Sequence, residues 1–113
     1  MMALEQVLDT VGRLDRRDLS LWIERRWVRP HHEAGGYVFT ELDVARITLI
    51  CEMRDDMAID DEAMPVVLGL LDQLYGTRRR LRNLVDAVAA QPEEVRRSIA
   101  AELRRRTLDG GDA

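Results

Sequence analysis

The segment 19–53 places the strongest limit on the fold, because a helix pattern, a hairpin pattern and a second helix pattern follow one another there. Leu19, Trp22 and Ile23 recur at helical spacing and predict a short helix. Pro30 lies just beyond it, and a proline cannot continue a helix because it lacks an amide hydrogen. The helix is therefore expected to end near residue 26.

A tight hairpin is predicted next. Val28 and Arg29 are expected to form the outgoing strand, and Tyr37–Phe39 the returning strand. Gly35 and Gly36 lie between them and permit the positive φ angles of a close turn. A helix, a two-stranded wing and a second helix, in this order, are typical of a winged helix-turn-helix module.

The helix after the hairpin begins with a capping signal. Thr40 and Asp43 have the spacing at which each side chain accepts a hydrogen bond from the backbone amide of the other. Within this helix one apolar stripe is predicted, widened by neighbouring apolar positions. The stripe is Leu42, Ala45, Leu49 and Met53, and the widening positions are Val44, Ile47, Ile50 and Cys51. Because a helix this apolar is usually buried on more than one side, we expect it to be the central helix of the core.

A first short helix precedes the segment. Leu4, Val7, Leu8 and Val11 have helical spacing, and Gly12 is a plausible stop signal. Asp15 can then accept hydrogen bonds from the free amides of the next helix.

A heptad pattern dominates the chain after residue 60. The apolar seam is Val67, Leu71, Leu74, Leu81, Val85 and Val88, and Arg78 interrupts it once. An isolated helix of this length would leave an apolar stripe in water, so the pattern predicts packing against another helix, most simply a second copy of the chain. Asp60 or Asp61 should cap this long helix, and Pro92 suits the start of a short C-terminal helix.

These patterns predict a mainly α protein with a small two-stranded wing. We expect a winged module over 1–60, a long helix plus a C-terminal helix for dimerisation over 61–107, and a disordered tail over 108–113.

Composition excludes several function classes. The net charge is −4, and all 17 basic residues are arginine. A free-standing nucleic-acid-binding domain is more often basic. One cysteine rules out an internal disulfide and fits a reducing cytoplasm, and no apolar run approaches the roughly 20 residues of a membrane span. Adjacent His31 and His32 would point to opposite faces of a strand and chelate a metal poorly together. The sequence also has no Gly-rich phosphate loop, no acid–base set around a histidine and no metal-ligand spacing, so no metal, cofactor or catalytic set is expected.

Three motifs carry a resemblance to a known family. They are LWIERRWVRP, the returning strand with its helix start YVFTELDVARI, and IDDEAMPVVLGLLDQLYGTRRRLR. Together they look like the chaperone modulatory protein CbpM, a branch of the MerR-like winged helix-turn-helix group, over about 19–88. The resemblance implies a bacterial cytoplasmic protein that is not an enzyme. It also implies that the protein binds the J-domain of a DnaJ-like co-chaperone of the CbpA type. This binding would prevent the co-chaperone from stimulating DnaK.

The chain departs from the DNA-binding relatives of that family at two places. Those relatives usually carry a pattern like T-L-R-Y-Y-E in the second helix, but here Ser20 takes the arginine position and Leu21 one aromatic position. The usual glycine before the wing is Arg26. The first departure weakens a DNA-reading function, although several arginines remain in the second helix and the wing, and the second leaves the geometry of the turn before the wing open.

Two charged sets follow from these alternatives. The residues Asp55, Asp56, Asp60, Asp61 and Glu62, called the acidic cluster below, are the candidate J-domain surface; the structural alternative is helix capping and solubility. The residues Arg16, Arg17, Arg25, Arg26 and Arg29, called the arginine set, are the candidate DNA surface of a MerR-like transcriptional regulator; the structural alternative is an exposed, ion-paired face. A third possibility is a truncated regulator kept as an interaction scaffold.

Overall fold

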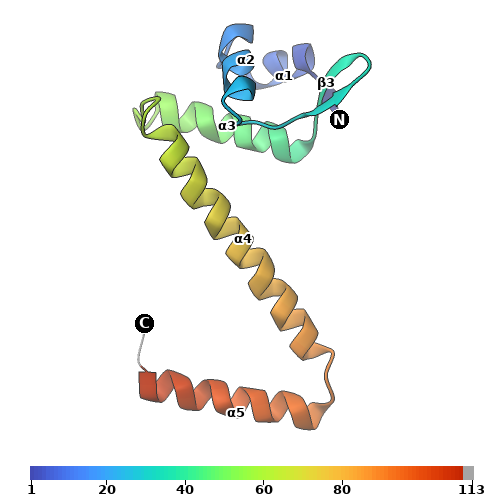
Figure 1. Ribbon diagram of the computed structural model, residues 1–113, viewed down its shortest axis with the longest axis vertical. Helices are drawn as coiled ribbons and strands as arrows, with labels where there is room; N and C mark the ends of the chain where they lie inside the picture. The colour runs from blue at the N-terminus through green and yellow to red at the C-terminus, as the bar shows by residue number, and fades with distance from the viewer. Residues whose placement is uncertain (111–113) are drawn as a thin grey trace. The chain divides into compact units, whose positions relative to one another are not determined.

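A computed structural model describes residues 1–110 of the chain. It is mainly helical, with a small three-stranded antiparallel sheet (Figure 1). The elements in order are β1 (Met2–Ala3), α1 (Leu4–Val11), α2 (Arg16–Glu24), β2 (His31–Glu33), β3 (Gly36–Phe39), α3 (Glu41–Asp55), α4 (Met64–Ala89) and α5 (Glu93–Gly110). The mainly α class is as expected, and the sheet has one strand more than the predicted wing.

The chain divides into two compact units, Met1–Leu70 and Leu71–Ala113. The boundary lies within α4, later than the boundary expected at residue 60. Met64 and Leu68 are buried side chains of the first turns of α4, with exposed fractions of 1% and 3%. The first unit therefore includes the beginning of the long helix.

The helix ends of the first unit form as the side chains predict. The Asp15 carboxylate accepts a hydrogen bond from the amide of Asp18 at 2.9 Å. Thr40 and Asp43 form the reciprocal capping box, at 3.1 and 2.9 Å. Gly12 follows α1 with a φ angle of 71°, which is the left-handed conformation of a helix stop.

The sheet corrects the predicted hairpin. Its strand order is β1-β3-β2, and the outgoing strand is β2, His31–Glu33, instead of Val28 and Arg29. The chain turns earlier because Arg26 has a φ angle of 63°, and the amide of Trp27 donates to the carbonyl of Trp22 at 2.9 Å. This turn directs Val28 into the core, where it is fully buried.

The buried face of α3 is only partly the one expected. Three of the four widening positions, Ile47, Ile50 and Cys51, are fully buried, and Val44 is half-buried. Of the predicted stripe, Met53 is buried, with 3% exposed. Leu42 is 79% exposed, however, Ala45 is also exposed, and Leu49 is half-buried. At 100° per residue, Leu42 and Ala45 lie about 80–180° around the helix from the fully buried Ile47, Ile50 and Cys51. The predicted core stripe is therefore wrong for Leu42 and Ala45, is only partly buried at Leu49 and is confirmed at Met53.

The predicted seam of α4 lies largely on the surface of the single chain. Leu74, Leu81 and Val85 are 44%, 58% and 56% exposed, and the remaining seam residues Val67, Leu71 and Val88 are half-buried. Asp60 caps the helix start by accepting from the amide of Ala63 at 2.8 Å. Helix α5 continues to Gly110, so residues 108–110, expected in the tail, are helical, and residues 111–113 lie outside the described residues.

Candidate functional site

The acidic cluster lies at the end of α3 and in the turn that leads to α4. Arg13 donates to Asp56 at 2.9 Å and lies 3.5 Å from Asp55. The Nε atom of Arg54 donates to Asp55 at 2.7 Å. Two carboxylates of the cluster are therefore neutralised by arginines of the same unit.

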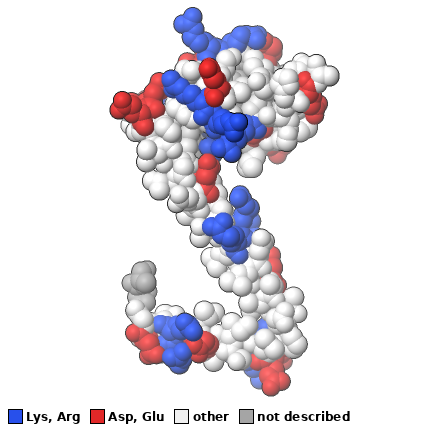
Figure 2. Space-filling model, in the orientation of Figure 1, with Lys and Arg blue, Asp and Glu red and all other residues white. Residues whose placement is uncertain are grey.

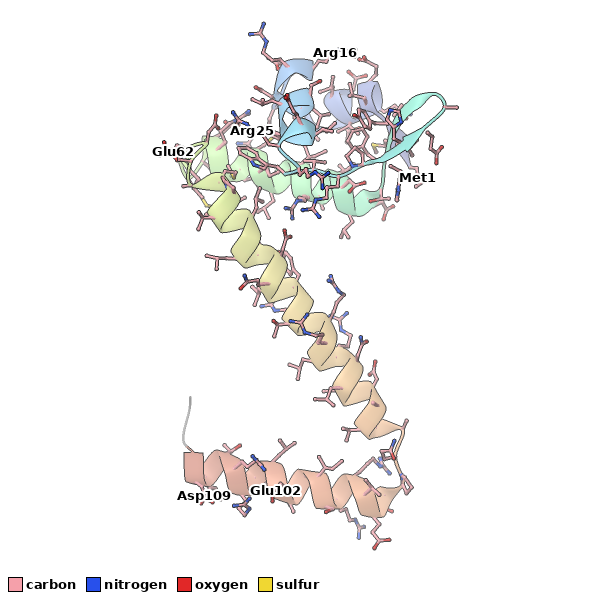
Figure 3. The ribbon with its side chains drawn as sticks, viewed as in Figure 1. Met1, Arg16, Arg25, Glu62, Glu102 and Asp109 are labelled. Atoms are coloured by element: carbon pink, nitrogen blue, oxygen red, sulfur yellow. The ribbon has the colours of Figure 1, made fainter. Side chains whose placement is uncertain are left out.

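The other carboxylates of the cluster differ in their contacts. Asp60 caps α4, and Asp61 pairs with Arg25 at 3.3 Å. Glu62 is exposed and forms no ion pair with any of residues 1–110. Figure 3 shows Glu62 at the turn before α4, on the same side of the first unit as Arg25. Four of the five carboxylates thus have a partner within the first unit, although only Asp60 caps a helix, and Glu62 remains available to a partner protein.

Arg54 is the centre of a contact network that the sequence did not reveal. Its guanidinium donates to Asp18 at 3.1 Å and to the backbone carbonyl of Arg13 at 2.8 Å, in addition to Asp55. It also lies over the ring of Trp22, 5.4 Å from the ring centroid. The hydrogen bond from Arg54 lowers the pKa of Asp55 below its ordinary value. The network joins α2 and α3.

The arginine set does not form one continuous surface. Arg16 pairs with Glu5, and Arg25 pairs with Asp61 and lies 5.2 Å from the ring centroid of Trp27. Figure 3 shows Arg16 and Arg25 at opposite ends of α2. The other members, Arg17, Arg26 and Arg29, are exposed and form no ion pair within residues 1–110. Two of the five charges are thus compensated inside the protein.

Charge is distributed unevenly between the two units. Residues 1–70 contain eight arginines and fourteen carboxylates, for a net charge of −6, whereas residues 71–113 contain nine arginines and seven carboxylates, for a net charge of +2. Figure 2 shows groups of arginine side chains on the first unit with carboxylate side chains beside them. The unit predicted to read DNA is the acidic one.

The histidines and the cysteine, whose side chains can bind a metal, differ in their burial. No group of three or more His, Cys, Asp or Glu side chains is placed within residues 1–110 to hold a metal ion. His31 and His32 are exposed, and the His32 ring contacts Tyr37 edge to face, with centroids 4.9 Å apart. Cys51 is buried, and that burial raises the pKa of its thiol. None of these groups forms an acid–base pair.

Comparison with known proteins gives no assignment: no family model matches the chain, and neither a curated protein nor a solved structure is similar to it. Among residues 1–110, no helix has the length and apolar character needed to cross a membrane. The function must therefore be argued from charge, exposure and the motifs of the sequence.

Proposed function

We propose that this protein is a chaperone modulator that binds the J-domain of a DnaJ-like co-chaperone of the CbpA type and inhibits its stimulation of DnaK. The observation that carries the proposal is the net charge of −6 on residues 1–70. The CbpM-like motifs supply 33 of the 70 residues of that unit. A J-domain of that type presents a basic helix, so the charges of the two proteins are complementary.

Electrostatics favour such a partner over duplex DNA. Complementary charge accelerates the encounter of two proteins and fixes their orientation. Phosphates would instead meet a surplus of carboxylates, because Arg16 and Arg25 are already paired. The unpaired Glu62 is the member of the acidic cluster best suited to a basic partner, since binding would break no internal ion pair.

The proposal includes a homodimer formed through α4. Leu74, Leu81 and Val85 expose about half of their surface and repeat with coiled-coil spacing. Exposed apolar residues in such a line are costly in water unless a second helix covers them. A second copy of the same seam is the simplest cover.

Isothermal titration calorimetry with the purified J-domain tests the proposal. We expect micromolar or tighter binding that weakens as salt is added, together with loss of J-domain-stimulated DnaK ATPase activity. The charge reversal Glu62→Lys should weaken binding, whereas Glu94→Lys, an equal change at an exposed position of α5, should leave the Kd unchanged. Absence of heat and of ATPase inhibition at micromolar concentrations would overturn the proposal.

A MerR-like transcriptional regulator is the alternative. It is favoured by one observation: Arg17, Arg26 and Arg29 are exposed and unpaired within residues 1–110. Fluorescence anisotropy with DNA from the region upstream of the gene tests it. Sequence-selective binding that falls steeply with salt, and that is lost in the variant Arg25→Ala/Arg29→Ala, would support this function over the first.

A further inference from the structure

Helix α3 carries an apolar line on its solvent side. Leu42, Ala45 and Leu49 follow one another at three- and four-residue spacing, so they form a single ridge. Leu42 is 79% exposed, Ala45 is exposed and Leu49 is half-buried. The core face of the helix is already complete without them, because Ile47 and Ile50 are fully buried. The line is therefore additional to what folding of the first unit requires.

Carboxylates border this line on one side. Glu41 and Glu52 lie on nearly the same side of α3 as Ala45, at 100° per residue, and neither forms an ion pair within residues 1–110. On the other border, Arg46 donates a hydrogen bond from Nε to the backbone carbonyl of Trp27. Its guanidinium is thus bound to the segment that follows α2. The border open to a partner is acidic.

We propose that this face of α3, defined by Leu42, Ala45 and Leu49 with Glu41 and Glu52 at its edge, binds an amphipathic helix with a basic border on the partner protein. The inference rests on the proposed function and names its surface. Seven residues separate Leu42 from Leu49, about 10 Å along the helix axis, which matches two turns of a facing helix.

Charge selects this occupant. The first unit has a net charge of −6, and two of its fourteen carboxylates, Glu41 and Glu52, lie at the edge of the apolar line. An acidic or neutral helix would gain only the apolar contact, whereas lysines or arginines at its border would also pair with these carboxylates. Such a partner reads the surface through alternating apolar and basic contacts, as an amphipathic helix does in a hydrophobic groove.

The test compares Leu42→Asp and Leu49→Asp with the matched control Leu108→Asp. Leu108 is 85% exposed and lies on α5, so the same substitution there leaves the face unchanged. Two probes are titrated: the J-domain, and a synthetic 18-residue helical peptide with leucine on one face and arginine on its border. Circular dichroism verifies that each variant folds, and sedimentation velocity measures its mass. Loss of a central apolar contact should weaken binding of either probe by roughly thirtyfold or more.

The outcomes separate this inference from the proposed function. Weaker binding of the J-domain by the α3 variants but not by Leu108→Asp supports it. Unchanged J-domain binding by the α3 variants overturns it and leaves the proposed function intact. If the wild type does not bind the J-domain, the proposed function fails and the peptide titration tests the surface. Peptide binding by the wild type that is lost in Leu42→Asp supports the surface. Absence of peptide binding by the wild type overturns the inference. A smaller mass for Leu42→Asp than for the wild type also overturns it, because a second copy would then cover the face.

Discussion

Replacing Arg54 by methionine should destabilise the first unit far more than an exposed arginine would. The side chain of Arg54 is 29% exposed and contacts Asp18, Asp55, the carbonyl of Arg13 and the ring of Trp22. Its partners Asp18 and Arg13 are 36 and 41 residues away in the chain, so these contacts hold the unit's tertiary structure together. Methionine keeps the apolar stem and removes the charge and every donor.

The contacts give the size of the effect. The hydrogen bond to the Arg13 carbonyl contributes about 1 kcal/mol to the free energy of unfolding. Each of the two partly exposed ion pairs adds roughly 0.5 kcal/mol. The contact with the Trp22 ring adds about another 0.5 kcal/mol. Arg54→Met should therefore lower the free energy of unfolding by about 2–3 kcal/mol.

Urea unfolding followed by tryptophan fluorescence measures this change, because both tryptophans, Trp22 and Trp27, belong to the first unit. The matched control is Arg16→Met, since the Arg16 side chain is 64% exposed and pairs only with Glu5. That control should stay within about 0.5 kcal/mol of the wild type. Equal losses for the two variants would refute the reasoning, because burial and tertiary partners would then not determine the contribution of an arginine.

Three further results are expected. Thr40→Ala removes half of the capping box and should lower the free energy of unfolding by about 1 kcal/mol in the same urea assay; no change would mean that the box does not hold the start of α3. Arg54 lowers the pKa of Asp55 in the folded state, so this pair stabilises the protein above about pH 4 and the stabilisation is lost as the pH falls. The difference in the free energy of unfolding between the wild type and Arg54→Met should therefore shrink between about pH 7 and pH 3. Leu81→Asp should convert a dimer into a folded monomer in sedimentation velocity, and a monomeric wild type would exclude the seam.

Local chemistry made the helix ends of the first unit predictable. Asp15, Thr40 and Asp43 each bind a backbone amide three residues away, and Gly12 adopts the left-handed conformation that stops α1. Each of these capping signals involves only residues within about one helical turn of one another. The helices themselves were predicted from the spacing of apolar residues, and these capping signals located where the helices begin and end.

Contacts between distant residues were beyond that kind of reasoning. Strand β1 has only two residues, and Met2 pairs with Phe39 across the sheet, so no periodic pattern announces it. The ion pair of Arg13 with Asp56 joins residues 43 positions apart. The sequence shows that Arg26 stands where the DNA-binding proteins it resembles usually have a glycine. It does not show that Arg26 adopts a positive φ angle, or that the chain then turns Val28 into the core.

The candidate surfaces show the same division. The acidic cluster could be located from the order of residues in the sequence. Its ion pairs with Arg13, Arg54 and Arg25 are evident only in the structure. The stripe of α3 is a line of apolar residues as predicted, but only Met53 lies in the core, whereas Leu42 and Ala45 are exposed. Helical spacing identifies which residues share a face, but it does not say which face the rest of the fold covers.

The buried thiol of Cys51 can be used to measure transient opening of the core around α3. Cys51 is the only cysteine of the chain, it is fully buried, and its environment disfavours the thiolate that reacts with alkylating reagents. A thiol reagent added to the native protein can reach this sulfur only when the contacts around α3 separate briefly. The rate of thiol labelling therefore measures how often the core around α3 opens. Comparing this rate with and without a bound partner shows whether binding reduces the frequency of opening.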